Sequence, residues 1–488
     1  MALVAAPRPS PARLLVGLTA SLLVAACSGA DGPPGVWESC GGGFECLTLD
    51  VPLDHDAPGG PTVALPLVRR RADRYDARLG SLIINPGGPW SSGVSWVKAR
   101  AERLPAALRA HFDIVGFDPR GSNDSAPGVD CTDDLGAYAA LDLTPNDDAA
   151  RKALADATDA LVDGCSARSG DLLPHMGTDS VARDLDLVRQ TLGDDRLTFL
   201  GFSYGTLLGA VYADRFPQNV RALVLDAAID PTLTGEAWIT AQGRAFEQQL
   251  DDFLADCAAD TECAFHADGD PEAAYDAIQA SLESERMPAS RDGTRTLGPG
   301  EFAYGVSAAL YGPNGWRQLA RALALAADGD GAGLLALADG YLERESEGTY
   351  GNGLEVYYAV TSLDTPFARE QATYDALVDE LSVSAPRLGV YFPYTAFPSA
   401  RWPVQPWRPA APIHADGAPP ILVVGTTRDP ATPHAWAESL AAQLSSGVLL
   451  SRDGQGHAAF LKGNTCIDDA VTRYLIEGVP PADGTVCR

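Results

Sequence analysis

Six short runs of apolar residues, each ending in a polar or glycine-containing turn, constrain the fold of this chain more than any other feature. They are "SLIINPGG", "FDIVGFDPRG", "LTFLGFSYG", "ALVLDAAID", "PILVVGTTRDP" and "GVLLSRDGQGHA". Such runs are typical of strands buried on both faces, and helical patterns separate them along the chain. The sequence therefore predicts an α/β fold, with a mostly parallel sheet covered by helices on both faces.

A serine stands at the end of the third run, in "GFSYGT". Gly201 and Gly205 flank Ser203, and they let the backbone turn sharply with the hydroxyl exposed at the start of the next helix. The G-x-S-x-G pentapeptide alone is a weak signal, but the place between a strand and a helix is the one that a nucleophile needs. We predict that Ser203 is a nucleophile and that the N–H of Tyr204 helps to bind an oxyanion.

A base and an orienting acid are required, because a serine hydroxyl alone is a poor nucleophile. Asp429 follows the run "ILVVG" and His457 follows "VLL", so both are expected at strand ends. The order Ser, Asp, His along the chain is that of the α/β-hydrolases. Asp226, at the end of the next predicted strand, is an alternative acid, and His434 is a second histidine near Asp429.

The stretch "INPGGPW", residues 84–90, is a candidate for the second half of an oxyanion hole. Gly87 and Gly88 end a predicted strand. Because glycine has no side chain, a substrate carbonyl can approach their backbone N–H groups. A plain turn is the alternative. Together with the serine motif, the stretch favours Gly88 as an oxyanion donor.

The first 27 residues are predicted to be a targeting segment. Arg8 and Arg13 precede the apolar run "LLVGLTASLLVAAC", which is too short for a membrane-spanning helix. The small residues before Cys27 resemble a bacterial lipobox, so we expect residues 1–27 to be a lipoprotein signal, with Cys27 lipidated. Ordinary signal cleavage with Cys27 unmodified is the alternative. Residues 28–39 then form a tether.

Nine cysteines are present, and eight remain when Cys27 is set aside. An even number in an exported chain favours disulfides. No metal site is expected, since neither C-x-x-C nor H-x-x-x-H occurs. The simplest assignment pairs sequence neighbours: Cys40 with Cys46, Cys131 with Cys165, Cys257 with Cys263, and Cys466 with Cys487.

Residues 233–405 differ in character from the rest of the chain. They are rich in Ala, Leu and acidic residues, as in "FEQQLDDFLADCAAD", and contain few strand-like runs. We expect a mainly helical cap here, inserted between a first core part at 40–232 and a second core part at 406–488.

Several motifs taken together resemble the tripeptidyl aminopeptidase branch of the prolyl aminopeptidase family of α/β-hydrolases. They are "NPGGP", "VGFDPRG", "GFSYGT", "VLDAAIDP", "GTTRDPATP" and "GQGHAAF", with a TAP-like C-terminal segment ending "GTVC". The resemblance spans residues 40–487 and implies a secreted or lipid-anchored enzyme that needs no cofactor. It also implies functional residues: the triad Ser203, Asp429 and His457, and the oxyanion donors Gly88 and Tyr204.

The chain departs from the family pattern at two places. It reads "GGPWSSG" where the family usually has "GGPGGSG", so Trp90 and Ser91 are expected to narrow or reshape the acyl pocket. Ser362 and Ser399 stand where relatives commonly carry cysteines. Their presence implies one missing cap disulfide and a more mobile cap.

The resemblance implies a serine exopeptidase that releases short, tripeptide-type N-terminal peptides through an acyl-enzyme on Ser203. Its substrates would be peptides with a free N-terminus, and Glu355 and Asp364 are candidate acids for binding the ammonium. Ordinary solvated cap charges are the alternative for both. The net charge of −29 argues against a nucleic-acid partner, and membrane contact is expected only through the lipid anchor.

Two other functions stay open. A carboxylesterase or lipase would use the same triad on esters, which the motifs cannot separate from amides. A surface-anchored binding lipoprotein with an inactive hydrolase fold is the third candidate, and the complete set of predicted catalytic residues argues against it. For each candidate we expect export, with the protein either lipid-anchored on the outer face of the cell membrane or released.

Overall fold

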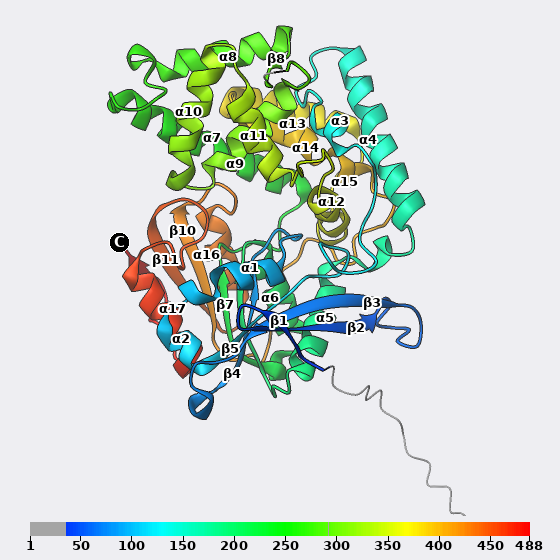
Figure 1. The fold of residues 1–488 in the computed structure, drawn as a ribbon, viewed down its shortest axis with the longest axis vertical. Helices are drawn as coiled ribbons and strands as arrows, with labels where there is room; N and C mark the ends of the chain where they lie inside the picture. The colour runs from blue at the N-terminus through cyan, green and yellow to red at the C-terminus, as the bar shows by residue number, and fades with distance from the viewer. Residues whose placement is uncertain (1–35, 291) are drawn as a thin grey trace, which may run out of the picture. The chain divides into compact units, whose positions relative to one another are not determined.

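A ten-stranded sheet forms the centre of the computed structural model, which describes residues 36–290 and 292–488 (Figure 1). The predicted signal peptide, the lipidation site Cys27 and most of the predicted tether lie outside these residues. The strands, in their order across the sheet, are β1 (Glu38–Gly41), β2 (Phe44–Pro52), β3 (Thr62–Arg70), β5 (Phe112–Phe117), β4 (Gly80–Asn85), β6 (Leu197–Phe202), β7 (Val220–Asp226), β10 (Ile421–Arg428), β11 (Gly447–Gln455) and β12 (Thr485–Cys487).

The seven strands from β5 to β12 in this order pair in parallel, and β1, β2 and β3 add an antiparallel extension at one edge. Every residue of β4, β5 and β6 is buried, as expected for strands covered on both faces. The six predicted strands are all present, and the predicted α/β-hydrolase fold class is confirmed. The antiparallel extension was not predicted, because its strands are only half-buried and less uniformly apolar.

Helices cover both faces of the sheet. One face packs against α5 (Thr178–Thr191), α6 (Tyr204–Arg215) and α16 (His434–Gln443), through side chains such as Leu185, Leu208 and Leu440. The other face packs against α1 (Gly93–Arg100), α2 (Ala106–His111) and α17 (Thr465–Glu477), through Val97, Leu108 and Val471. The carboxyl ends of the parallel strands therefore stay open at one edge, where loops can assemble a site.

A second group of helices lies over that edge (Figure 1). Between β7 and β10 the described residues form nine α-helices and the short hairpin of β8 (Met287–Pro288) and β9 (Thr296–Leu297). The helices are α7 (Gly235–Ala259), α8 (Pro271–Ser284), α9 (Pro299–Leu310), α10 (Pro313–Ala327), α11 (Ala332–Tyr341), α12 (Gly353–Asp364), α13 (Gln371–Ser384), α14 (Phe392–Thr395) and α15 (Phe397–Arg401).

Two further helices pack with this group although they precede β6 in the chain. α3 (Leu135–Ala139) and α4 (Asp148–Ser169) share an apolar cluster with the cap, in which Ala139 and Leu154 lie with Tyr374 and Phe397. The sequence-based division placed them in the first core part at 40–232. An amphipathic helix shows in its sequence that one face is buried, but not which layer buries it.

Four disulfides are present, and they join the four pairs of sequence neighbours: Cys40–Cys46, Cys131–Cys165, Cys257–Cys263 and Cys466–Cys487. Cys131–Cys165 ties the segment before α3 to α4, and Cys466–Cys487 ties α17 to the last strand. Among the described residues, no helix is both long enough and apolar enough to cross a membrane.

Candidate active site

Ser203 occupies a sharp turn between β6 and α6. Its backbone has φ +53° and ψ −120°, a conformation that a residue with a side chain rarely adopts. The flanking glycines are needed for close packing, because a Cβ on Gly201 would lie 2.3 Å from the carbonyl oxygen of Gly205. The Ser203 N–H donates to the carbonyl of Asp226 at 2.9 Å. The turn is therefore held from the neighbouring strand, as the predicted nucleophile position requires.

His457 and Asp429 meet at the ends of β11 and β10. The Nδ1 atom of His457 lies 2.9 Å and 3.0 Å from the two carboxylate oxygens of Asp429. The carboxylate is buried and also accepts the N–H groups of Ala431, Thr432 and Ala458. Because a carboxylate only accepts, Nδ1 carries the proton and Nε2 is left as the basic nitrogen. The pair has the arrangement of a base and its orienting acid.

Asp226, the alternative acid, has a different environment. Its buried carboxylate accepts the N–H groups of Ala459, at 3.0 and 3.1 Å, and of Phe460, at 2.8 Å. Burial raises the pKa of Asp226 to about 6. Asp226 thus holds the segment that follows His457, whereas Asp429 contacts the imidazole itself. The other histidine, His434, bonds to Ser451 at 2.8 Å.

The glycine loop after β4 lies against the serine turn. A Cβ on Gly87 would lie 2.9 Å from the Cβ of Ser203, and a Cβ on Gly88 would lie 2.3 Å from the Trp90 nitrogen. Both glycines have positive φ, of 101° and 111°. Tyr204 is the first residue of α6, so its N–H has no partner within that helix. The two predicted oxyanion donors, Gly88 and Tyr204, therefore flank Ser203.

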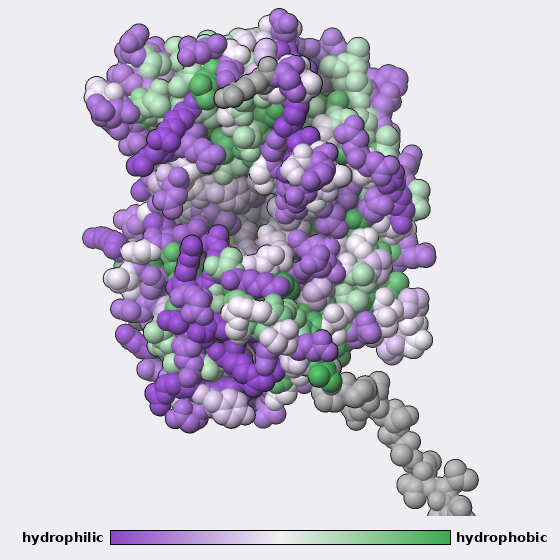
Figure 2. All heavy atoms as spheres, viewed as in Figure 1, coloured by the Kyte–Doolittle hydropathy of each residue, from purple (hydrophilic) through white to green (hydrophobic). Residues whose placement is uncertain are grey.

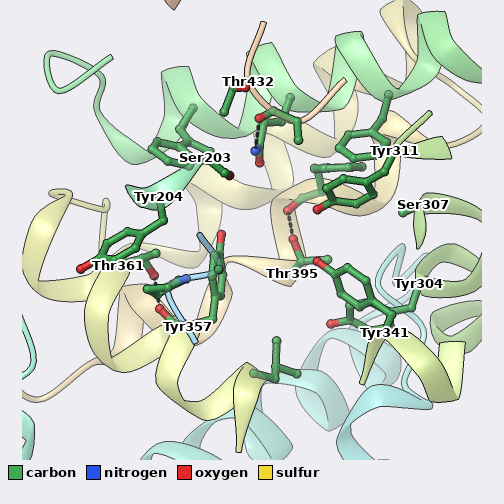
Figure 3. A pocket seen from close by; sticks show the side chains of 18 of the residues that line it. Ser203, Tyr204, Tyr304, Ser307, Tyr311, Tyr341, Tyr357, Thr361, Thr395 and Thr432 are labelled. Carbon is green, nitrogen blue, oxygen red and sulfur yellow. Dashed lines mark hydrogen bonds between the residues drawn. The ribbon is translucent and has the colours of Figure 1, made fainter. Parts of the chain in front are cut away.

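A pocket rich in aromatic side chains opens beside Ser203, between the core and the cap (Figures 2 and 3). No Asp, Glu, Lys or Arg is among the described residues that line it. We call it the aromatic pocket; its aromatic wall consists of Trp90, Tyr204, Trp238, Phe246, Tyr304, Tyr311, Tyr341, Tyr357, Tyr358, Tyr391 and Phe392.

A second hollow also reaches Ser203, and Gly88 and His457 line it as well. It continues past His457, sharing Pro86 and Ser91 with a groove on the surface of the core. We call this groove the histidine-side groove; the lining residues that matter below are Ser91, Ser95, Arg100, Glu343, His457 and Lys462.

One cap residue, Tyr311, connects the aromatic pocket with His457. The N–H of His457 donates to the carbonyl of Tyr311 at 2.7 Å, and the two rings pack edge to face with centroids 5.5 Å apart. Trp90 lines the pocket as well, and its ring packs edge to face on Tyr357 and Tyr341. The residue that departs from the family pattern thus forms part of the pocket wall.

The two acids predicted to bind a substrate ammonium, Glu355 and Asp364, do not line the aromatic pocket, and that prediction needs correction. Glu355 is buried, and one carboxylate oxygen accepts the N–H groups of Cys131 and Thr132, each at 3.1 Å. Burial raises the pKa of Glu355 to about 7. On α12, Leu354 and Tyr357 point into the pocket instead, so Glu355 lies on another face of the helix.

Asp364 is engaged in the same way. It accepts the Thr178 N–H at 2.8 Å, the Thr178 hydroxyl at 2.5 Å and the Trp407 indole N–H at 2.7 Å. Burial raises the pKa of Asp364 to about 6. Thr178 Oγ1 also bonds to the Tyr204 hydroxyl at 2.6 Å, so Asp364 supports, through Thr178, the residue that follows Ser203. Glu355 thus holds backbone donors of the scaffold, and Asp364 holds both backbone and side-chain donors.

Apart from Tyr204, sequence reasoning missed the tyrosines of the aromatic pocket. They come from α9, α11 and α12 and from the connections between cap helices, and in sequence they are indistinguishable from core aromatic residues. One signal in the sequence could have found two of them. Tyr304 and Tyr311 are seven residues apart, which is two helical turns, so both are expected on the same side of α9.

Comparison with known proteins gives consistent matches over the chain. Residues 80–268 match the α/β-hydrolase fold family model, and residues 386–487 match the model of the TAP-like proteins. The chain is 38% identical to the serine protease Hip1 of Mycobacterium tuberculosis, over 91% of this chain and 88% of that protein. It is 36% identical to carboxylesterase B of Mycobacterium tuberculosis (91% and 86%) and 32% identical to the tripeptidyl aminopeptidase of Streptomyces lividans (92% and 86%).

Proposed function

Since this chain belongs to the α/β-hydrolase family that includes the tripeptidyl aminopeptidases, we propose that it is a serine aminopeptidase that releases short N-terminal peptides. The observation that carries this proposal is the pairing of His457 with the buried Asp429 beside the hollow that Ser203 also lines. A base oriented by an acid next to a serine on a nucleophile turn is the machinery of acyl transfer.

The proposed reaction begins with the Ser203 hydroxyl. His457 Nε2 takes its proton while the oxygen attacks the substrate carbonyl, and Asp429 stabilises the imidazolium that forms. The N–H groups of Gly88 and Tyr204 bind the developing oxyanion. His457 then gives the proton to the leaving amine, which departs and leaves an acyl-enzyme. Water, activated by the same histidine, hydrolyses the ester and restores Ser203.

The two hollows have different roles in this scheme. The leaving group must lie where His457 can protonate it, so the hollow and groove on the histidine side take the released peptide. The aromatic pocket contains Ser203 and Tyr204 but not His457, so it takes the acyl part, which is the N-terminal peptide. Cap helices cover the aromatic pocket. A covered pocket has room for only a limited number of residues before the scissile bond.

The wall of the aromatic pocket determines how a free N-terminus is recognised. Without a carboxylate at the described wall, an ammonium there is met by tyrosine rings, hydroxyls and carbonyls. A cation over an aromatic ring gains about 0.5 to 2 kcal/mol, which corresponds to roughly a two- to thirtyfold preference over a blocked N-terminus. A buried carboxylate partner would give a larger preference.

A carboxylesterase is the second candidate, and the same uncharged wall favours it. An acyl chain without a charge needs no ionic partner, and a pocket lined by aromatic side chains favours it by apolar burial. The 36% identity to carboxylesterase B supports this candidate in addition.

One comparison separates the two candidates. A tripeptide amide is offered with a free and with an acetylated N-terminus, next to the matching simple ester. The aminopeptidase is expected to cleave the free peptide two- to thirtyfold better, and a Ser203→Ala preparation serves as the blank. Equal or better cleavage of the acetylated peptide, with the ester far ahead of both, would establish the esterase instead.

We also propose that the protein acts outside the cytoplasm, anchored through a lipid on Cys27 or released. The four disulfides support export, since such bonds persist in oxidising compartments. Metabolic labelling with a fatty acid tests the anchor. The label is expected on the wild-type protein and is expected to be lost in Cys27→Ala.

A further inference from the structure

The histidine-side groove carries two cations that the proposed chemistry does not use. Arg100 is the last residue of α1, and Lys462 lies five residues after His457. Both side chains are exposed, and neither forms an ion pair within 4.0 Å with any described residue. The chain has 65 acidic and 36 basic residues, so two unpaired cations beside its catalytic histidine call for an explanation.

The electrostatics of the groove point to a missing anion. The surrounding protein and the guanidinium groups of Arg100 and Arg452 lower the pKa of the Lys462 ammonium more than the nearby Asp226 and Asp429 raise it. Arg452 is already engaged, since it donates to the carbonyls of Gln455 at 3.2 Å and Ala458 at 3.5 Å. Arg100 and Lys462 therefore remain to receive a negative group from outside the chain.

An acid, Glu343, also lines the groove, but its surroundings show that it is not the anion that pairs with Arg100 and Lys462. Burial raises the pKa of Glu343, and the nearby Gly353 N–H and Trp90 indole N–H oppose this shift. Its carboxylate is thus directed to the cap and to the glycine loop, and no ion pair joins it to either cation.

We infer that Arg100 and Lys462 form a subsite for a carboxylate on the leaving group. This inference rests on the proposed function and refines it: favoured substrates carry an acidic side chain, or the free carboxyl terminus, within about two residues after the scissile bond. The groove begins at His457, which protonates the leaving group, and a peptide advances about 3.3 to 3.6 Å per residue. Because His457 and both cations line this one groove, we place the carboxylate a short distance after the scissile bond.

The test uses pairs of peptides that differ only in charge. A tripeptide is extended by Ala-Asp amide or by Ala-Asn amide, so that the two substrates share shape and acyl part. Exposed ion pairs are individually weak, and two of them are expected to raise kcat/KM for the Asp peptide about two- to thirtyfold. The preference is expected to appear mainly in KM and to shrink in 0.5 M salt, because salt screens exposed charges.

Three variants locate the effect. Arg100→Gln and Lys462→Gln are each expected to lower the Asp-to-Asn ratio, and the double variant to bring it to about one. Lys98→Gln is the matched control, because Lys98 is exposed on the same helix, carries the same charge and does not line the groove. It is expected to keep the wild-type ratio.

The outcomes that overturn the inference are distinct from those that overturn the proposed function. A wild-type ratio near one, or an equal loss in Lys98→Gln, would show that no local carboxylate subsite exists. If no peptide is cleaved in a Ser203-dependent way, the aminopeptidase proposal fails. The ratio is then measured on two esters whose alcohol part ends in a carboxylate or in an amide, and the same three variants decide the subsite.

Discussion

The core and the cap contribute to the site in different ways. In the core, two buried carboxylates hold the loop that carries His457: Asp429 contacts His457 and Ala458, and Asp226 contacts Ala459 and Phe460. In the cap, tyrosine side chains on separate helices line the aromatic pocket. The core thus positions reacting atoms through backbone hydrogen bonds, whereas the cap shapes the space around the substrate. Substitutions in the core should therefore change the rate of chemistry, and those in the cap should change stability or selectivity.

The largest expected effect is that of Ser203→Ala in the core. It removes the nucleophile and a single half-buried hydroxyl, so turnover is expected to fall by about three to six orders of magnitude while the melting temperature stays the same. Hydrolysis of a chromogenic tripeptide and a thermal melt measure the two. If the variant keeps a tenth of the activity, Ser203 is not the nucleophile, and the proposed role of the core in the chemistry is wrong.

Asp429→Asn is expected to have the next largest effect, about four orders of magnitude in kcat, because an amide in this place favours the wrong imidazole tautomer. Asp226→Asn should cost only about ten- to a hundredfold, since it disturbs the loop and not the imidazole. Steady-state kinetics on the two variants compare them. A nearly normal Asp429→Asn beside an inactive Asp226→Asn would exchange the roles of the two acids.

A disulfide introduced into the cap should change stability without changing the chemistry. The hydroxyls of Ser362 and Ser399 are buried and lie 2.9 Å apart, at a sequence separation of 37. Closing a loop of this length in the unfolded chain is worth at most about 3 to 4 kcal/mol. The double variant Ser362→Cys, Ser399→Cys is expected to melt several degrees higher when oxidised than when reduced, with unchanged kcat/KM. Equal melting of both forms would show that this contact does not limit cap stability.

The smallest expected effect is that of Glu355→Gln, and it depends on pH. The pKa of Glu355 is about 7 in the folded protein, against 4.5 for the ordinary group, so the folded state keeps a proton that the unfolded chain releases. The stabilising contribution is present below pH 4.5 and is lost as the pH rises to about 7, a difference of at most about 3 kcal/mol. Glutamine can accept the same N–H groups without a charge. Urea unfolding should therefore find the variant more stable than wild type at pH 8 and equal to it at pH 4.

The same variant tests the corrected assignment of the cap acids. Because Glu355 holds the N–H groups of Cys131 and Thr132, Glu355→Gln is expected to keep the wild-type ratio of free to acetylated peptide cleavage. If the variant loses the preference for the free N-terminus, Glu355 binds the substrate ammonium. Glu355 would then be part of the substrate site and not only of the scaffold.

Much of the core was predictable because its signals are local. The turn at Ser203 needs glycines within two residues, and a strand buried on both faces is a continuous apolar run. Parallel strands bring their carboxyl ends to one edge, so residues that follow such runs, as Asp429 and His457 do, are expected to meet there. The four disulfides follow the same logic, since each joins sequence neighbours.

The fold class, the candidate triad and the simplest pairing of the cysteines could thus be inferred from the amino-acid sequence, because each depends on short motifs and their order. Which face of α12 meets the aromatic pocket is seen only in the folded chain, where Tyr357 lines the pocket and Glu355 accepts amide N–H groups of the scaffold. It alone also placed α3 and α4 beside the cap and brought Arg100 and Lys462 to one groove. The physical reason is that packing partners distant in sequence decide the direction of a side chain, and no local pattern records them.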